Sequence, residues 1–569
     1  MAGIKEETVT SLKLHVTGII LQELAEKHVN EISATHGTTG VTGLGLLDHR
    51  CSQNTDIVGC LVHQFFTVHF YICLVVCTIA RKFSKNMAVS KEYVLFYGSV
   101  IFTTFASEPL NTDLTDMKKL IMAGLVLLLP LALCAEITKK EDINKDNLYK
   151  FRGSMTQYED PGVTYSKAPK GFKPFYMSHY GRHGSRYLLN TPQYADPYNM
   201  LKQADDKGIL TDFGKDVLRR IEIMAKDADG HLGDLTIVGQ QQHRGIARRM
   251  VRNYPEIFNK KATIVARSTT SHRVIASMTS ALMEFSSILP QMTIDFNDSD
   301  FDKGYMNTED RAINSAKNSR ERNAAVNAFN AKHNNPERLM CALFTDTTFI
   351  TRYERTSSSG AVSVSDRSND LYTKIYDIAA NMGSHTYLGF DLDDVFTYDE
   401  WYDCWLQNNL YWFSVSGYHK LTQDVVPYGH ATLLQDLLDK ADIAIANGTP
   451  AANLRYGHDT ALYPLLCLME VNDCGFEPDD IEDLATKWVN YDIVHMGSNL
   501  QLIFFKDKSG KILVRALLDE REATLPVECY KDAKGKEYNY FYEWDKVEKY
   551  YRDILAKWDK IKAELTTTK

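Results

Sequence analysis

The chain has 569 residues, a formal net charge of −9 and 44% hydrophobic residues. A chain of this length can bury at least one large core. Its 31 tyrosines and 25 phenylalanines argue against a disordered protein. The acidic balance gives no indication of nucleic-acid binding.

The first 116 residues differ from the rest, because they contain no amphipathic pattern typical of a folded domain. Their clearest feature is the apolar run at 58–80, which is long enough to cross a membrane. His63, Gln64 and His69 oppose that interpretation, since polar groups cost free energy in hydrocarbon. We expect residues 1–116 to be a spurious or a membrane-associated extension.

Residues 117–135 have the layout of a secretory signal peptide. Lys118 and Lys119 form a basic start, an apolar stretch follows, and small residues end the segment. Lipidation of Cys134 ranks lower as an interpretation, because the bulky Leu133 precedes it.

Two explanations fit a signal peptide at this position. In the first, which we favour, Met117 is the true first residue. In the second, residues 58–80 and 120–135 are two membrane spans, and the basic residues between them lie in one cytoplasmic loop. Both explanations predict export of residues 136–569, to the periplasm or the outer surface, with membrane anchoring in the second.

Five cysteines lie in the part predicted to be exported, so at least one is a free thiol or bonds another molecule. Cys467 and Cys474 are close enough in sequence to form a disulfide, although spacing alone does not establish one.

After residue 136, strand-like runs alternate with helix-like ones, which favours an α/β sheet with helices on both faces. In chain order we expect a strand at 172–179, helices at 211–226 and 240–254, a strand at 262–268, a helix at 272–285, a strand at 452–458, a hairpin formed by 500–507 and 512–519, and a terminal helix at 543–564. Residues from about 295 to 447 are richer in helix formers, and we interpret them as a mostly helical cap inserted into the sheet domain.

Each of the three expected strands at 172–179, 262–268 and 452–458 leads into a polar cluster. Residues 182–186 read Arg-His-Gly-Ser-Arg, residues 267–273 read Arg-Ser-Thr-Thr-Ser-His-Arg, and residues 455–460 read Arg-Tyr-Gly-His-Asp-Thr. Because ligands of open α/β sheets bind beyond the carboxyl ends of the strands, we expect the three clusters to lie together.

The residue types in these clusters suit a phosphate ester. Guanidinium groups match a phosphate dianion, and a histidine held among them is kept neutral, with a lone pair that can attack phosphorus. Gly184 would let the backbone approach the phosphate. Asp459 is the only carboxyl group in the clusters, and a bound phosphate should raise its pKa and keep it protonated for the leaving alcohol.

Each cluster also has a structural interpretation when taken alone. Arg182 and Arg186 would serve equally well as surface ion-pair partners. His179 and His183 have the spacing of helical metal ligands, but the glycines around them favour a strand-to-turn segment, so we expect no metal there. The three clusters together are a more specific signal than any one of them.

From about residue 148 to 547 the chain resembles the histidine acid phosphatases, clade two of the histidine phosphatase superfamily. Residues 182–186 are similar to the family signature Arg-His-Gly-x-Arg, and residues 458–459 to its His-Asp motif. Residues 268–277 are similar to the stretch with the third phosphate-binding arginine, and residues 235–245 to a Leu-Thr-x-x-Gly helix start.

The resemblance implies a three-layer αβα sandwich of the phosphoglycerate-mutase-like type with a helical cap. It implies an exported phosphomonoesterase with a small phosphorylated substrate, no nucleic-acid partner, and no metal or cofactor. It makes His183 the phosphorylated nucleophile and Asp459 the proton donor. The phosphoryl group would be held by Arg182, Arg186, Arg273 and His458.

Two departures from the family pattern leave the branch open. Tyr187 and Leu188 stand where the family often has a proline soon after the second signature arginine. The layout is most similar to multiple inositol polyphosphate phosphatases, but these usually have His-Ala-Glu at the second motif, whereas His-Asp is usual in phytases and general acid phosphatases. The expected substrate is therefore an inositol polyphosphate, with a broad-specificity acid phosphatase, a phosphoglycerate-mutase-like phosphotransferase and a non-catalytic phosphate-binding surface protein as alternatives.

Overall fold

The computed structural model describes residue 140 and residues 143–567, apart from 308–309, 357–358 and 479. The predicted extension at 1–116 and the predicted signal peptide at 117–135 lie outside these residues. Within the described ranges, no helix combines the length and apolar character needed to cross a bilayer.

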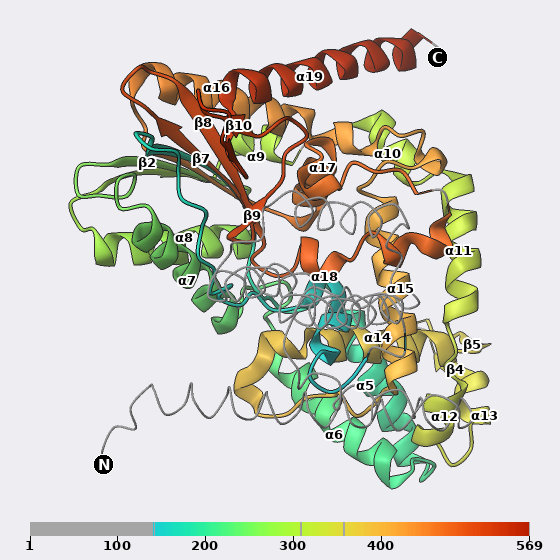
Figure 1. Ribbon diagram of the computed structural model, residues 1–569. Helices are drawn as coiled ribbons and strands as arrows, with labels where there is room; N and C mark the ends of the chain where they lie inside the picture. The colour runs from blue at the N-terminus through green and yellow to red at the C-terminus, as the bar shows by residue number, and fades with distance from the viewer. Residues whose placement is uncertain (1–139, 141–142, 308–309, 357–358, 479, 568–569) are drawn as a thin grey trace, which may run out of the picture. The chain divides into compact units, whose positions relative to one another are not determined.

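The main sheet has eight strands and is mixed (Figure 1). Its path is β12-β8-β7-β1-β6-β2-β3, with β9 paired to β8. The parallel part consists of β1 (Lys173–Arg182), β6 (Ala452–Gly457), β2 (Thr263–Ser268) and β3 (Thr293–Asn297). The antiparallel part consists of β7 (Asn499–Lys506), β8 (Ile512–Leu518), β9 (Arg521–Ala523) and β12 (Tyr542–Glu543). The predicted hairpin is confirmed by the pairing of β7 with β8.

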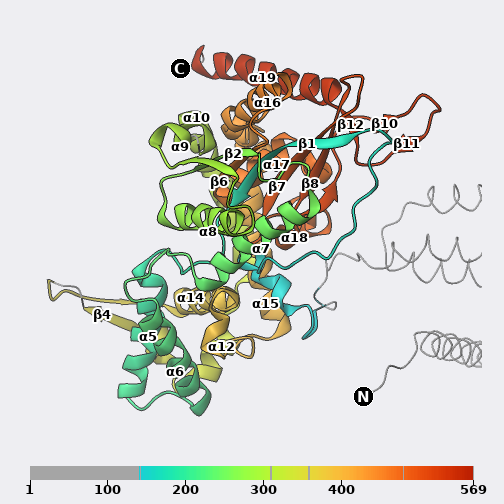
Figure 2. The same cartoon turned by 90° about the vertical axis from the view of Figure 1, so that its left-hand side faces the viewer.

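Helices cover both faces of this sheet (Figure 2). One face carries α7 (Ile237–Asn253) and α8 (His272–Ile288), and the other carries α16 (Ala431–Asn447), α17 (Asp459–Leu468) and α19 (Trp544–Thr567). Alternate strand residues separate the two cores, as the period of a strand requires: Tyr180 packs with the α16 side and Met177 with the α7 side. The predicted three-layer αβα sandwich is confirmed.

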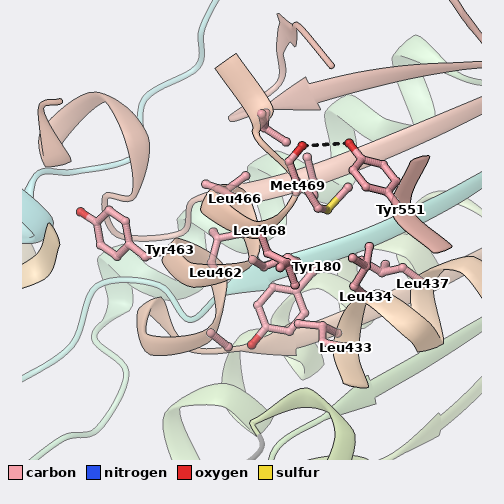
Figure 3. Packing of buried hydrophobic residues seen from close by; sticks show 14 of the residues in the cluster. Tyr180, Leu433, Leu434, Leu437, Leu462, Tyr463, Leu466, Leu468, Met469 and Tyr551 are labelled. Carbon is pink, nitrogen blue, oxygen red and sulfur yellow. Dashed lines mark hydrogen bonds between the residues drawn. The ribbon is translucent and has the colours of Figure 1, made fainter. Parts of the chain in front are cut away.

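Figure 3 shows how the β1 strand is covered on its α16 face. The fully buried ring of Tyr180 lies among leucines of α16 and α17, which include Leu433 and Leu462. Each such leucine contributes roughly 2 kcal/mol through burial of its side chain. On the same face the Tyr551 hydroxyl of α19 donates to the Met469 carbonyl oxygen at 3.0 Å. This packing fixes the strand that leads into the first polar cluster.

A second group of helices lies beyond the sheet (Figure 2) and has its own core. It contains α5 (Thr191–Asp206), α6 (Asp212–Asp227), α12 (Glu337–Leu343), α14 (Ser368–Asn381) and α15 (Tyr398–Ser414). The segment 295–447 that we interpreted as a cap is mostly helical, but the structure divides it. Its last helix, α16, packs on the sheet, whereas α12, α14 and α15 pack with α5 and α6 from an earlier part of the chain. This helical group is therefore assembled from two separate stretches of the sequence, and α5 and α6 come from the earlier one.

Apart from α11, the remaining elements are short. The helices are η4 (Leu148–Met155), α9 (Asp300–Met306), α10 (Arg311–Lys317), α11 (Arg320–His333), α13 (Thr348–Thr351), η5 (Met382–Leu388), η6 (Lys420–Thr422), η7 (Val426–His430), η8 (Val471–Asp473), η9 (Ile481–Thr486) and α18 (Asn490–Ile493). The strands form two small hairpins, β4 (Tyr353–Thr356) with β5 (Val362–Ser365), and β10 (Tyr530–Lys531) with β11 (Glu537–Tyr538).

Side-chain caps explain where the helices near the site begin. Thr236 accepts a hydrogen bond from the Gly239 backbone N–H, so α7 starts at Ile237, three residues before the predicted position. Thr211 caps α6 in the same way through Gly214. Apolar periodicity alone does not detect a first helical turn that is defined by its cap.

Candidate active site

The three polar clusters meet at one edge of the sheet, as the sequence predicts. The strands β1, β6 and β2 are neighbours and run parallel, so their carboxyl ends lie side by side. In the register of these strands Arg182 lies opposite Gly457, and Ser268 lies opposite Tyr456. The residues that follow each strand therefore share one place in the fold.

Arg182 is the most deeply buried charge at this edge, with 0% of its surface exposed. Its Nη1 donates to the Ser154 carbonyl oxygen at 2.6 Å, and its Nη2 lies 2.7 Å from Asp459 Oδ2. A buried guanidinium needs such partners, because burial of an unpaired charge is costly. These contacts fix the guanidinium beside the first residue of α17.

The ring of His183 is buried and its tautomer follows from its contact. Its Nδ1 lies 2.9 Å from the Gly184 carbonyl oxygen. A carbonyl only accepts hydrogen bonds, so Nδ1 carries the proton and Nε2 keeps its lone pair. Burial lowers the pKa of His183 well below its usual value, and the charges of Arg182, Arg273 and Arg186 lower it further. The ring is therefore neutral at ordinary pH.

Gly184 also has a structural reason that the sequence did not predict. A Cβ at this position would lie 2.6 Å from the Gly239 carbonyl oxygen, and a Cβ on Gly239 would lie 2.3 Å from the Ser185 carbonyl oxygen. The loop after β1 thus rests directly on the first turn of α7, and both residues must lack a side chain. The close approach is between two backbones of the protein, which explains why the helix-start motif contains a glycine.

Arg186 and Arg273 supply two further guanidinium groups. Burial lowers the pKa of Arg186 to about 10, and it also lowers the pKa of Arg273. In the described part of the chain, the buried Nε atoms of both residues have no hydrogen-bond partner. The Nε atoms of Arg220 and Arg515, away from this site, are in the same state, so it is the charge of Arg186 and Arg273 beside His183 that suits an incoming anion.

His458 lies at the N-cap of α17 and faces His183, with ring centroids 5.8 Å apart. Its Nδ1 accepts from Arg273 Nη2 at 3.4 Å, so its Nε2 carries the proton and donates to Thr269 Oγ1 at 3.0 Å. The backbone N–H of His458 donates to the Tyr180 hydroxyl at 3.2 Å.

Gly457 makes that last bond possible. A Cβ at Gly457 would lie 2.0 Å from the Tyr180 hydroxyl oxygen, closer than any two such atoms can approach. The glycine of the third cluster therefore lets the ring of Tyr180 reach the backbone at the start of α17. This contact ties the position of His458 to the core of the sheet.

Asp459 is the first residue of α17, where the partial positive charge of the helix favours a carboxylate. Burial alone would raise the pKa of Asp459, but the charges of Arg182 and Arg186 outweigh it and lower the pKa below its usual value. Its Oδ1 also accepts from the Thr460 backbone N–H at 2.8 Å. In this structure Asp459 is therefore the ionised partner of Arg182.

Two arginines of the clusters lie outside this group. Arg267 pairs with Asp295, its Nη2 being 3.0 Å from Oδ2, and Arg455 pairs with Asp436, its Nε being 2.7 Å from Oδ2. Arg267 lies within β2 and Arg455 lies within β6, so both side chains project from a strand and not from the loop that follows it. Their ion pairs stabilise the fold. His179 is enclosed in the α7-side core beside Tyr456.

Three supporting residues were not predicted from the sequence. The Ser185 backbone N–H donates to Gln242 Oε1 at 2.9 Å, and the Gln242 amide donates to Gln157 Oε1 at 3.0 Å. Ser277 accepts from the Gly184 backbone N–H at 3.1 Å. Only the glutamine run at the start of α7 gave a sequence signal, and it did not identify which glutamine reaches the loop.

Tyr187, which replaces the proline of the family pattern, connects the loop to the helical group. Its hydroxyl donates to Asp227 Oδ2 at 3.0 Å and lies 2.8 Å from the Tyr387 hydroxyl, which also bonds Asp227. Its ring stacks on His231 with centroids 5.4 Å apart. We name these four residues the Tyr187 clamp. Side-chain bonds thus fix a turn that a proline would stiffen.

Within the described ranges, no three His, Cys, Asp or Glu side chains gather in a way that could hold a metal ion. The described cysteines, Cys467 and Cys474 among them, are free thiols.

The comparison with protein families settles the broad class. The model of the histidine phosphatase superfamily (branch 2) matches residues 181–519, which is more than half of the chain. The chain belongs to this branch of the histidine phosphatase superfamily. The predicted resemblance is confirmed, and the protein is a phosphatase.

Solved structures of this class with a TM-score above 0.5 share the fold. A multiple inositol polyphosphate phosphatase from Bifidobacterium longum in complex with phosphate has 20% sequence identity and a TM-score of 0.55, over 70% of this chain and 96% of its own. The same protein in complex with inositol hexasulfate gives 19%, 0.54, 70% and 96%. A phytase from D. castellii has 14% identity and a TM-score of 0.47, over 75% of this chain and 89% of its own. No curated protein matches the chain in sequence.

Proposed function

We propose that this histidine phosphatase removes phosphate from inositol polyphosphates through a phosphohistidine formed on His183. One observation carries the proposal: the Gly184 carbonyl fixes the proton on Nδ1 of a neutral ring, so the lone pair of Nε2 is free. That ring lies in the field of three guanidinium groups, which suits a nucleophile that must attack an anionic phosphate.

Arg182, Arg186, Arg273 and His458 are the groups that we assign to phosphate binding. Their position supports the assignment, because all four act electrostatically on the His183 ring. His458 would present a proton to the phosphate from Nδ1 once Arg273 turns to the anion. Its partner Thr269 allows this change, because a hydroxyl can donate to Nε2 as readily as it accepts.

The reaction has two steps in this proposal. In the first, His183 Nε2 attacks phosphorus, the ester P–O bond breaks, and Asp459 passes a proton to the departing alkoxide oxygen. In the second, water attacks phosphorus while the Asp459 carboxylate accepts a proton from it. The P–N bond breaks, its electron pair returns to Nε2, and inorganic phosphate leaves.

Binding of the substrate prepares Asp459 for the first step. A phosphate dianion competes for the Arg182 guanidinium that Asp459 pairs with at 2.7 Å. The loss of this pair and the added negative charge both raise the pKa of Asp459. The carboxyl group can then take up the proton that it later donates.

The substrate class rests on similarity. The solved structures from Bifidobacterium longum that share the fold are named for inositol polyphosphates, and one holds inositol hexasulfate. A broad-specificity acid phosphatase is the second candidate, because His458 and Asp459 form the His-Asp motif usual in phytases and general acid phosphatases.

A phosphate-release assay on the full chain tests this proposal. With EDTA present, we expect release from inositol hexakisphosphate that exceeds release from a panel of simple phosphomonoesters, and no release by the His183→Ala variant. Normal turnover by that variant would sink the mechanism. Equal turnover of the whole panel would favour the second candidate, and phosphoryl transfer without net phosphate release would favour a mutase-like enzyme.

We also propose that residues 136–569 act outside the cytoplasm, on the strength of the signal-like layout of residues 117–135. N-terminal sequencing of the protein recovered outside the cytoplasm tests this. A mature terminus at or near residue 136 is the expected result, and recovery of the chain only from the cytoplasm would contradict it.

A further inference from the structure

The turn between β8 and β9 buries two acidic side chains behind the candidate active site. Asp519 and Glu520 each have 2% of their surface exposed, although two-residue hairpin turns normally lie in solvent. Both residues have left-handed backbones, with φ of 51° and 60°, which non-glycine residues rarely adopt. Strain of this kind, combined with buried charge, is a feature that needs a compensating role.

Glu520 holds the turn in place through a closed set of bonds. Arg249 donates to it from Nη2 at 2.6 Å, and the Tyr158 hydroxyl donates to Oε2 at 2.8 Å. Its charge is therefore paired and fully bonded, as a buried carboxylate requires. This arrangement leaves Asp519 pointing at the segment 494–499.

Asp519 contacts segment 494–499 at three points. Its Oδ1 accepts from the Asn499 backbone N–H at 2.8 Å, and its Oδ2 accepts from the Ser498 hydroxyl at 3.2 Å. Its Oδ2 also lies 3.3 Å from His495 Nε2. One carboxyl group thus spans most of the segment.

Segment 494–499 in turn encloses the first signature residues. The Arg182 backbone N–H donates to the Ser498 carbonyl oxygen at 2.8 Å, and the His183 carbonyl oxygen accepts from the Gly497 N–H at 3.0 Å. The Arg182 side chain donates from Nη1 to the Val494 carbonyl oxygen at 3.4 Å. Any movement of this segment would therefore move both the nucleophile's backbone and the phosphate-binding guanidinium.

The contact between Asp519 and His495 contains a single proton. His495 Nδ1 lies 3.3 Å from the Met496 carbonyl oxygen, which only accepts, so the ring proton is on Nδ1. One proton lies between Nε2 and Oδ2, either on the ring or on the carboxyl group. Burial favours the carboxyl group, because it raises the pKa of Asp519 to about 7 and lowers the pKa of His495 to about 4.

We propose that Asp519 is a positioning residue for phosphoryl transfer: it acts as a protonated acid that holds segment 494–499, and through it the backbone of Arg182 and His183. The proposal rests on the proposed function, since it assigns Asp519 a role in that reaction. It predicts that the hydrogen-bonding pattern of the side chain matters and that its negative charge does not.

Two substitutions of Asp519 separate these properties. Asp519→Asn keeps a carbonyl for the Asn499 N–H and offers an amide donor to His495 Nε2, and asparagine tolerates the left-handed backbone. Asp519→Gly removes the side chain, and glycine accepts the same backbone without strain. A matched control is Asp473→Gly, because Asp473 is exposed and has the same left-handed backbone, with φ of 59°.

The expected result is a split between the variants in turnover of p-nitrophenyl phosphate. Asp519→Gly should lower kcat about tenfold or more relative to Asp473→Gly, while Asp519→Asn should stay within about threefold of the unmodified chain. The melting temperatures of the two glycine variants should lie close together, so that the difference in kcat does not come from unfolding. Equal kcat for the two glycine variants would overturn the proposal, and so would an Asp519→Asn variant as slow as Asp519→Gly.

Two further measurements keep the proposal testable. If Asp519→Gly does not fold, Ser498→Ala removes one Asp519 contact, together with the bond that Ser498 Oγ accepts from the His495 backbone N–H at 2.8 Å, and should lower kcat about threefold; an unchanged kcat would count against the proposal. Calorimetric binding of inorganic phosphate gives a readout without turnover, and Asp519→Gly should bind it more weakly than Asp473→Gly. An unmodified chain that binds phosphate but releases none from any ester would refute the proposed function, whereas equal binding by the two glycine variants would refute the positioning role.

Discussion

At the residue scale, Asp459 has to be ionised and protonated at different points of the proposed cycle. In the free protein its carboxylate lies 2.7 Å from Arg182 Nη2, and the arginines hold its pKa below the usual value. A general acid in that state would be empty of its proton at neutral pH. We propose that the phosphate of the substrate binds the Arg182 guanidinium in place of Asp459. This raises the pKa of Asp459, so that its carboxyl group takes up a proton.

This account predicts two different alkaline limits for one substrate. The profile of kcat/KM reports the free enzyme, in which the pKa of Asp459 is lowered. Its alkaline decline should therefore occur at a lower pH than the alkaline decline of kcat. The profile of kcat reports the complex, in which bound phosphate raises the pKa of Asp459, so it should fall at higher pH. Steady-state kinetics across pH check the order of the two limits.

Asp459→Asn is the control for that experiment, because an amide does not titrate. Any limit that persists in this variant belongs to the substrate or to another group. If kcat and kcat/KM of the unmodified chain have their alkaline limits at the same pH, substrate binding does not raise the pKa of Asp459.

At the element scale, the loop after β1 is positioned by its contact with the first turn of α7. Gly184 and Gly239 face each other with no room for a Cβ on either side. Because His183 immediately precedes Gly184, this contact also fixes the position of the nucleophile. A shift of α7 would therefore be transmitted to the reacting ring.

Gly239→Ala should lower both stability and activity. The new Cβ would meet the Ser185 carbonyl oxygen at 2.3 Å, and this backbone cannot rotate away. We expect a loss of about 1–3 kcal/mol in the free energy of unfolding and a fall in kcat of about tenfold or more. Gly304→Ala is the matched control, because Gly304 is also helical and has nothing within 4 Å of its Cβ position. Equal effects of the two substitutions on kcat would contradict this role for the contact.

The Tyr187 clamp is the second contact between elements that we expect to matter. Tyr187→Phe removes the bond to Asp227 and the contact with the Tyr387 hydroxyl but keeps the stacked ring. We expect a loss of about 1–2 kcal/mol in the free energy of unfolding and a rise in KM of about threefold or more, because Arg186 precedes the clamp.

Tyr551→Phe provides the comparison for the clamp. It also removes one tyrosine hydrogen bond, to the Met469 carbonyl, but it does so in the core under α19 (Figure 3). Both variants should melt at lower temperature, and only Tyr187→Phe should change KM. A KM that is unaltered in Tyr187→Phe would mean that the clamp stabilises the fold without shaping the site.

At the scale of the whole molecule, buried neutral histidines set the response to acid. Burial lowers the pKa values of His243, His458 and His495 to about 4 and of His179 and His430 to about 3. A group whose pKa is lowered by folding stabilises the protein above its unfolded pKa, near 6.5, and loses that contribution as pH falls.

The protein should therefore lose stability as the pH falls from about 6.5 to 4. A single histidine with a pKa shifted to about 4 costs about 3 kcal/mol by pH 4. Asp377, Asp492, Asp519 and Glu520 act in the opposite direction, because a raised pKa weakens the folded state as the pH rises from about 4 towards that pKa, but the buried histidines with lowered pKa values are more numerous. Thermal denaturation at a series of pH values checks this, and a melting temperature that is constant or rises between pH 6.5 and 4 would contradict it.

The sequence was sufficient for features that depend on neighbouring residues. Strand-like runs that end in polar clusters predicted that these clusters, with the 182–186 and 458–459 motifs, meet. Partners from distant segments could not be predicted in this way. Nothing local shows that Arg455 pairs with Asp436, that Gly184 rests on Gly239, or that α5 packs with α14, because each contact depends on the folded chain. The burial of Asp519 could not be predicted either, because an acidic pair in a hairpin turn normally lies in solvent.

The most direct test of the central claim is to trap the phosphorylated protein. Rapid quenching of the full chain with a ³²P-labelled phosphomonoester should leave acid-labile, alkali-stable label on His183, bonded through Nε2. The His183→Ala variant should carry no label, and the Asp519→Asn variant should still carry it. Label on another residue, or turnover by the unmodified chain without any phosphohistidine, would contradict the account.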